Sequence, residues 1–286
     1  MKVSTEINSL SRKIGEAKAI EMYAKAGFDA YDLSTSGMVR FDWANNKLLE
    51  NDHPFMGNEY VKYMKELKNV ADGCGIVCNQ SHAPFPTRCK AIRDLFKRAI
   101  ECTAIVGGKI CIVHPDNDKS AEENAEMYYS LLPFAKEHGV KIATENMWNW
   151  NSAENHAAKA ACSDEESFIK HVDTVGDEYL VGCLDIGHAE MAGLNTSAVK
   201  MIYALGNRIE ALHIHDNDKR NDSHQIPFSM SIEFSPIVKA LKDIGYKGYF
   251  TLECDAYLGK FGGELEDGVK NLYNAVRRLA DEFEAL

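Results

Sequence analysis

The sequence predicts an α/β fold in which eight strand–helix units close into one (β/α)8 barrel, a single domain spanning residues 1–286. Short apolar runs and helix-like segments alternate along the whole chain. The runs are continuous rather than alternately apolar and polar, which is typical of parallel strands buried on both faces. The sequence contains neither a GxGxxG pattern nor a P-loop, so a doubly wound nucleotide-binding sheet is disfavoured.

Each strand is expected at one of the apolar runs, with a helix after it. The strands are expected at residues 3–8, 30–33, 75–81, 109–113, 140–144, 180–184, 209–212 and 248–252. The helices are expected at residues 16–26, 59–72, 87–106, 121–137, 164–175, 196–205, 235–244 and 265–283. Gly27 and Gly139 mark two of the helix ends, because glycine adopts the left-handed conformation that closes a helix. The long polar segment 34–55 is expected to cover the site or to form a subunit interface.

The composition argues against nucleic-acid and membrane association. The formal net charge is −11, so the average field repels polyanions and disfavours nucleic acid as a substrate. No apolar stretch is long enough to span a bilayer, and the N-terminus lacks the apolar core of a signal peptide, so we expect a cytoplasmic protein. The eight cysteines form no CxxC pair, and we expect buried reduced thiols.

Four of the apolar runs end in side chains that metal ions bind: Glu145, Asp185, His213 and Glu253. A carboxylate or imidazole directly after a buried strand is costly unless something pairs it. Each residue alone has an ordinary explanation, such as a salt-bridge partner or a helix N-cap. The four together favour one shared divalent metal at the C-terminal ends of the strands, where barrels of this type carry their chemistry. Three carboxylates and one imidazole favour Mn²⁺, Mg²⁺ or Co²⁺, with Zn²⁺ also tolerated.

Further histidines surround these four residues. His82 and His114 follow the third and fourth strands, and each alone fits a core or capping histidine equally well. His188 lies three residues after Asp185 and would converge on the same centre if the strand ends in a turn. Together they bring polar groups to the mouth of the barrel.

The segment around His213 offers more candidates. His213 and His215 alternate in an extended segment and would therefore point the same way, but one ligand is enough and we assign His213. Asp222 and His224 add an acid and an imidazole in the next loop, where charges are usually only solvated.

Several motifs give the chain a family resemblance. They are Ser81-His82-Ala83-Pro84-Phe85, Val113-His114-Pro115, Thr144-Glu145-Asn146, Leu184-Asp185-Ile186-Gly187-His188, Leu212-His213-Ile214-His215-Asp216, Asp222-Ser223-His224 and Leu252-Glu253. In this order the motifs resemble those of the xylose isomerase-like TIM barrel superfamily. That superfamily contains sugar and sugar-phosphate isomerases and epimerases, inosose dehydratases and AP endonucleases.

The resemblance implies roles for these residues. In the ketose 3-epimerases one metal is held by residues that match Glu145, Asp185, His213 and Glu253, and the two glutamates also act as acid and base. His188 matches a substrate-binding histidine. The segment from His213 to Arg220 departs from the epimerase pattern, so Arg220 is not a secure match for the epimerase arginine.

From these observations we predict a divalent-metal-dependent isomerase or epimerase of a small sugar, ketose or inosose. The metal would polarise a substrate carbonyl and stabilise the enediolate, while Glu145 and Glu253 remove and return the proton. The residues expected to bind the substrate are His82, His114, His188, His224 and Trp148. Trp43 and Trp150 are further candidates for stacking on the sugar, although loop packing explains all three tryptophans equally well. We expect a small carbohydrate as the partner, with a homo-oligomer left open.

Three alternatives stay open at this stage. An inosose-type dehydratase would use the same enolate. An AP endonuclease-like phosphodiester hydrolase would use three zinc ions, and second and third metals would bind through His82, His114, Asp222 and His224. The third alternative is a sugar-binding protein without catalysis.

Overall fold

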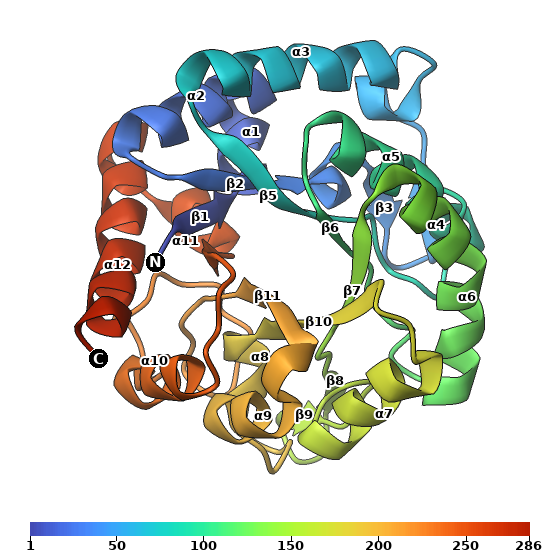
Figure 1. Ribbon diagram of the computed structural model, residues 1–286, viewed down its shortest axis with the longest axis vertical. Helices are drawn as coiled ribbons and strands as arrows, with labels where there is room; N and C mark the ends of the chain where they lie inside the picture. The colour runs from blue at the N-terminus through green and yellow to red at the C-terminus, as the bar shows by residue number, and fades with distance from the viewer.

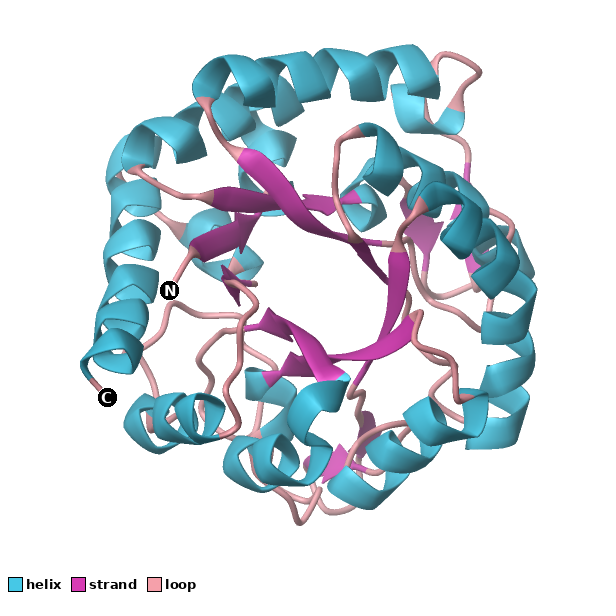
Figure 2. Ribbon diagram, in the orientation of Figure 1, coloured by secondary structure: helices cyan, strands magenta, loops and turns pink.

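The computed structural model describes the backbone of residues 1–286 and every side chain except that of Asp255. Eight parallel strands surround a central axis and the helices lie around them (Figures 1 and 2). The strands are β1 (Val3–Glu6), β2 (Ala30–Ser34), β5 (Val77–His82), β6 (Ile110–Ile112), β7 (Lys141–Glu145), β10 (Leu180–Asp185), β11 (Ile209–His213) and β12 (Phe250–Leu252). Their order in the sheet is β11-β10-β7-β6-β5-β2-β1-β12. The edge strands β11 and β12 meet through a parallel bridge between Ile214 and Leu252, which confirms the predicted barrel.

The outer layer consists of eight longer helices, one after each barrel strand. They are α2 (Glu16–Ala26), α3 (Tyr60–Cys74), α5 (Phe96–Ile105), α6 (Ala121–His138), α7 (Glu165–Val175), α9 (Ala198–Leu205), α10 (Phe234–Asp243) and α12 (Leu265–Ala285). Shorter helical segments are α1 (Asn8–Ile14), α4 (Lys90–Arg93), α8 (Ile186–Ala189), α11 (Asp255–Lys260), η1 (Thr35–Met38), η2 (Pro54–Met56) and η3 (Gly206–Arg208). Gly27 and Gly139 close α2 and α6 in the left-handed conformation, as predicted.

Two predicted boundaries are wrong. The first strand was expected to reach residue 8, but it ends at Glu6 because the Glu6 carboxylate accepts a hydrogen bond from the Ser9 backbone N–H at 3.1 Å and begins α1. The helix expected over 87–106 starts only at Lys90 and is divided into α4 and α5. Thr87 stays outside it because its hydroxyl donates to the carbonyl of His114 at 2.7 Å.

The loops after β2 and β7 contain two small antiparallel hairpins that the sequence did not predict. One joins β3 (Arg40–Asp42) to β4 (Lys47–Leu49) inside the polar segment 34–55, and the other joins β8 (Asn149–Asn151) to β9 (His156–Ala158). Their turns contain Asn46 and Asn155 at positive φ, a conformation that asparagine tolerates well. Each hairpin carries an exposed tryptophan, Trp43 or Trp150.

The barrel interior is apolar at one level and polar above it. Ala143, Cys183 and Ala211 belong to a small buried cluster with neighbouring strand residues. Glu145, Asp185 and His213 each lie two residues further along the same strands and therefore point to the same side, into the barrel. All eight cysteines are free; seven are buried, as expected, and Cys74 is exposed. None of the helices in the described part of the chain combines the length and apolar character that a membrane span requires.

Candidate metal centre

Four strand-end side chains converge at the C-terminal mouth of the barrel. Glu145, Asp185 and His213 are the last residues of β7, β10 and β11, and Glu253 follows β12. One ligand atom from each of the four lies within 4.8 Å of the others. His213 Nδ1 is 3.2 Å from an oxygen of Glu145 and 3.4 Å from an oxygen of Glu253. The sequence analysis predicted that these four side chains share one site, and the fold brings them together there.

The polar atoms of this group fit a bound cation. Both Glu145 oxygens, Asp185 Oδ2 and His213 Nδ1 are buried and have no hydrogen-bond partner. His213 Nδ1 and Glu145 Oε2 are 3.2 Å apart, within ion-pair distance, but neither atom makes a hydrogen bond with a described residue. Each buried polar atom without a partner costs on the order of 1–3 kcal/mol of folding free energy, so a shared partner is expected. A divalent cation among three carboxylates and one imidazole would supply that partner.

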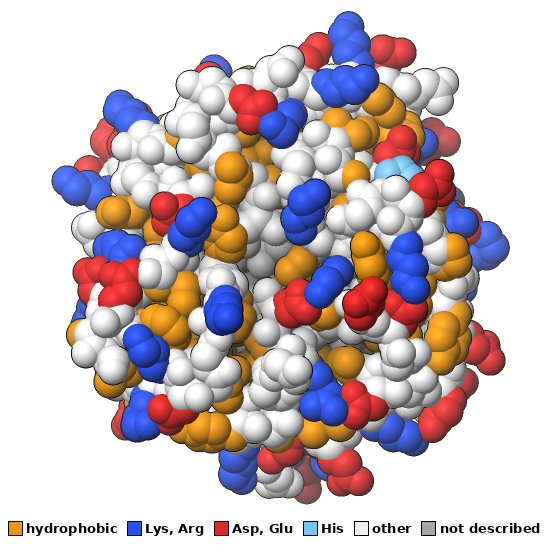
Figure 3. Space-filling view, viewed as in Figure 1, with side chains coloured by type: hydrophobic (Ala, Val, Ile, Leu, Met, Phe, Trp, Pro, Cys, Tyr) orange, Lys and Arg blue, Asp and Glu red, His pale blue; other side chains and the backbone are white. Residues whose placement is uncertain are grey.

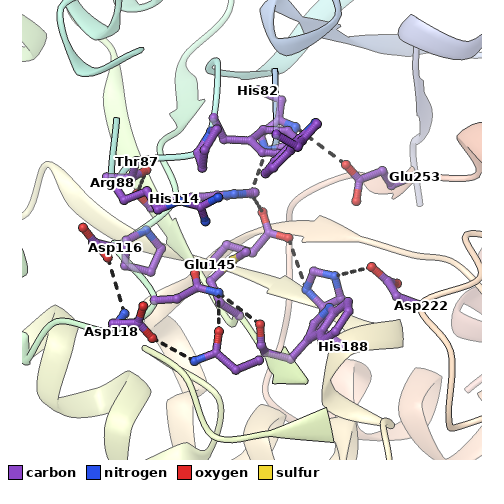
Figure 4. A pocket seen from close by; sticks show the side chains of 18 of the residues that line it. His82, Thr87, Arg88, His114, Asp116, Asp118, Glu145, His188, Asp222 and Glu253 are labelled. Carbon is purple, nitrogen blue, oxygen red and sulfur yellow. Dashed lines mark hydrogen bonds and ion pairs between the residues drawn. The ribbon is translucent and has the colours of Figure 1, made fainter. Parts of the chain in front are cut away.

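A second group of ligand-type side chains shares Glu145 with the first. It consists of His82, His114 and Glu145. The two imidazole Nε2 atoms face each other at 2.7 Å, and His114 Nε2 is 3.3 Å from Glu145 Oε2. In Figure 4, Glu145 lies between His114 and His188. A carboxylate shared in this way can bridge two ions.

A third group surrounds Asp222 in the loop after β11. Asp222 Oδ2 is 3.2 Å from His188 Nε2 and 3.1 Å from His224 Nε2. His215 Nε2 lies 3.4 Å from Asp222 Oδ1 and 3.1 Å from Asp185 Oδ1. The His215 ring stacks on that of His224, with centroids 4.2 Å apart. His213 and His215 therefore belong to different groups, and the assignment of His213 as a ligand of the first group stays a prediction.

Asp185 is a helix N-cap and still has one oxygen without a hydrogen-bond partner. Its Oδ1 accepts a hydrogen bond from the His188 backbone N–H at 2.7 Å and so caps α8, while Oδ2 stays available to a ligand. His188 Nδ1 lies 2.8 Å from the Asn146 carbonyl, which leaves Nε2 to face Asp222. Glycine at position 187 allows this turn to pack against His215, since a Cβ there would lie 1.9 Å from the His215 ring.

A cavity of about 270 Å³ opens above the three groups. All the side chains predicted to bind substrate line it, namely His82, His114, His188, His224 and Trp148. Glu145, Glu253 and Trp43 also line it, so the segment 34–55 does reach the site. Asp185 and His213 lie beneath the floor, and Trp150 is not part of the lining. Tryptophan and phenylalanine faces beside carboxylates and imidazoles are suited to a polyol ligand.

Comparison with known proteins identifies the family. The family model described as xylose isomerase-like TIM barrel matches residues 20–283. The chain belongs to this family. An uncharacterised protein of Methanocaldococcus jannaschii is 25% identical over 253 residues, which cover 82% of this chain and 78% of that protein.

Solved structures of the xylose isomerase-like fold superpose over the whole chain. A D-tagatose 3-epimerase-like protein has a TM-score of 0.73 at 22% identity, covering 100% of this chain and 99% of its own. An IolI protein with a bound zinc atom has a TM-score of 0.72 at 18% identity, with 100% of both chains covered. At these identities the likeness establishes the fold.

In this xylose isomerase-like barrel the two glutamates have opposite electrostatic surroundings. Burial would raise the pKa of Glu145, but the imidazoles of His213 and His114 outweigh burial and hold that pKa well below its usual range. Burial raises the pKa of Glu253 well above its usual range, and the nearby imidazoles oppose this only in part. One carboxyl is thus disposed to accept a proton and the other to donate one.

The imidazoles differ in the same way. Burial would lower the pKa of His188, but the carboxylates of Asp185 and Asp222 raise it to about 10. Burial and the neighbouring His114 hold the pKa of His82 well below its usual range. The surroundings of His188 therefore favour the protonated imidazole, whereas those of His82 favour the neutral form, which can bind a metal.

Asp32 is a site residue that the sequence analysis missed. Its Oδ2 lies 3.3 Å from His213 Nε2 and accepts a hydrogen bond from Gln80 Nε2 at 2.9 Å, with all three residues buried. A carboxylate on the far nitrogen of a metal-binding histidine fixes the ring and its tautomer. A signal was present in the sequence, because Asp32 is a carboxylate in the middle of a buried strand.

Proposed function

We propose that this protein is a divalent-metal-dependent isomerase or epimerase of a small carbohydrate such as a ketose or an inosose. The observation that carries the proposal is the pair of glutamates, Glu145 and Glu253, which share one ligand group and line one cavity with opposite pKa tendencies. The names of the similar structures, an epimerase-like protein and a zinc-containing protein, support it.

Glu145, Asp185, His213 and Glu253 would hold the ion. A bound divalent ion would polarise the substrate carbonyl and make the neighbouring C–H more acidic. Glu145, whose pKa the surrounding imidazoles hold low, would take the proton from carbon in its ionised form. Glu253, whose pKa burial raises, would return a proton to the opposite face or to the next carbon.

The remaining lining residues position the sugar. His82 and His188 hydrogen-bond its hydroxyls, and His114 and His224 extend that polar wall. Trp148 and Trp43, which both line the cavity, would cover the apolar face of the ring. A dehydratase would use the same proton abstraction and then expel a β-hydroxyl, so product analysis separates the two reactions.

Metal analysis and deuterium exchange test this proposal together. The purified protein should contain a divalent metal and should incorporate solvent deuterium next to the carbonyl of at least one ketose or inosose. Glu253→Gln should abolish this exchange while the protein stays folded. A protein that exchanges with none of the sugars but loses water from one is a dehydratase. One that does neither contradicts the proposal.

A second candidate is a phosphodiester hydrolase, and one specific observation favours it. Two of the ligand groups share Glu145, and the third, around Asp222, lies next to them, with His215 Nε2 3.1 Å from Asp185 Oδ1. Three such groups are suited to three ions, and bound zinc activates water for attack on phosphodiesters. The net charge of −11 argues against DNA, and on the face seen in Figure 3 basic and acidic side chains are interspersed. Three metals per chain together with nicking of abasic DNA would favour this candidate over the isomerase.

A further inference from the structure

A second cavity lies beside the metal centre, on the side of β1 and β2. Its volume is about 190 Å³, and it shares His82, Phe85, His224 and Glu253 with the larger cavity. Its outer wall comes from the ends of β1 and β2 and from α1 and η1, through Glu6, Asn8, Arg12, Ser34 and Ser36. The ligand group therefore has a polar cavity on each side.

The outer wall carries polar side chains that the protein itself does not satisfy. Asn8, Arg12, Ser34 and Ser36 make no side-chain hydrogen bond or ion pair with any described residue. Asn8 Oδ1 is buried without a partner, and Ser34 is only 5% exposed. Arg12 is exposed and Ser36 is half-buried, so water reaches both. A buried polar atom such as Asn8 Oδ1 is expected to have a partner, and a ligand in this cavity would supply it.

Two side chains of the outer wall, Asn8 and Glu6, have defined surroundings before any ligand binds. Gly37 leaves room for the Asn8 amide, since a Cβ there would lie 2.0 Å from Asn8 Oδ1. The Glu6 carboxylate accepts hydrogen bonds from the backbone N–H of Ser9 at 3.1 Å and from its hydroxyl at 2.5 Å. A wall fixed in this way loses little conformational entropy when a ligand binds.

The chemistry of the wall favours hydroxyl groups over a phosphate. A carboxylate such as Glu6 only accepts hydrogen bonds, whereas serine hydroxyls and the Asn8 amide both donate and accept. Sugar hydroxyls can satisfy all of these groups. A phosphate offers acceptors and negative charge, which Glu6 repels, and Arg12 is the one cation in this wall.

We propose that this second cavity is a subsite for a hydroxyl-rich unit attached to the reacting sugar. The substrate class is then a ketose that carries a second sugar unit rather than a free monosaccharide. The identity of the reacting unit rests on the proposed function, while the existence of the subsite does not.

Calorimetric binding to the metal-loaded protein tests the subsite. The probes are D-fructose, D-fructose 6-phosphate and isomaltulose, a glucosyl-fructose whose keto unit can open. Isomaltulose should bind about tenfold or more tightly than D-fructose, since one or two hydrogen bonds to a charged group account for that ratio. Arg12→Ala and Asn8→Ala should bring the ratio close to one. Lys13→Ala, which removes the adjacent exposed cation outside the cavity lining, should leave the ratio unchanged.

The same measurements separate the two proposals. Equal affinities for D-fructose and isomaltulose, tightest binding of the phosphate, or no binding of any probe would overturn the subsite. Deuterium exchange into D-fructose with equal affinities would leave the proposed reaction intact and remove the subsite. A tenfold preference for isomaltulose without exchange into any sugar would keep the subsite and remove the proposed reaction.

Discussion

Replacing Asp32 by asparagine should weaken metal binding without unfolding the protein. Among the proposed metal ligands, Asp32 contacts His213, whose Nε2 lies 3.3 Å from Asp32 Oδ2. The asparagine amide oxygen can still accept from His213 and Gln80, so the geometry persists while the negative charge behind the imidazole is lost. A neutral hydrogen bond is roughly half as strong as a charge-assisted one.

The magnitude follows from this loss. Removing a carboxylate that supports a metal-bound histidine lowers metal affinity on the order of 10- to 100-fold. Because Asp32→Asn keeps the hydrogen bond, we expect the lower limit, about tenfold, which equals ~1.4 kcal/mol of binding free energy. Asp32→Ala should reach the upper limit and also destabilise the metal-free protein by roughly 1–3 kcal/mol. It leaves His213 Nε2 without its Asp32 partner and Gln80 Nε2 with only the Leu212 carbonyl at 3.3 Å.

Competition titration with a chelator measures the affinity, and the absorption spectrum of the Co²⁺-loaded protein reports the ligand field directly. Asp29→Asn is the matched control, because Asp29 precedes the same strand and accepts from the Val3 backbone N–H at 2.8 Å, away from the centre. An Asp32→Asn protein with wild-type affinity and an unchanged Co²⁺ spectrum would refute the positioning role. An equal loss in Asp29→Asn would show a general effect of the substitution.

Three further predictions concern catalysis, pH dependence and packing. Glu253→Gln should lower the rate of deuterium exchange by about 10²- to 10⁴-fold, as loss of a general acid does, and a rate within tenfold of wild type would exclude that role. The His188 pKa is raised to about 10, so protonated His188 stabilises the fold fully below its unfolded pKa, and this contribution is lost as pH rises toward 10. Thermal unfolding of the metal-free protein should therefore show stability falling between pH 7 and 10. His188→Gln should flatten this slope. Gly187→Ala should destabilise by about 1–3 kcal/mol in denaturant unfolding, because its Cβ would meet the His215 ring at 1.9 Å, whereas Gly73→Ala, which meets nothing within 4 Å, should be neutral or stabilising.

The barrel and the convergence of the four strand-end side chains were predictable because both depend on local patterns. A buried parallel strand is an apolar run, and the residue that ends it faces the mouth wherever the run stops. Glu145, Asp185, His213 and Glu253 could therefore be assigned without knowing any contact between strands.

The missed features depend on contacts between distant segments. Asp32 and His213 are 181 residues apart, and only barrel closure places the carboxylate behind the imidazole. The hairpins around Trp43 and Trp150 were missed because their three-residue strands are too short for a period-two pattern to be recognised. The second cavity is lined in part by α1, a helix that was not predicted because residues 3–8 were expected to form a strand.

The facing rings of His82 and His114 tie ion uptake at the barrel mouth to a tautomer change. Two nitrogens 2.7 Å apart form a hydrogen bond only when one of them carries the hydrogen and the other presents its lone pair. An ion bound through both Nε2 atoms would need both lone pairs, so the donor ring would have to carry its hydrogen on Nδ1 instead. Because a neutral imidazole keeps one hydrogen in either tautomer, this exchange would leave the protonation state of the two rings unchanged.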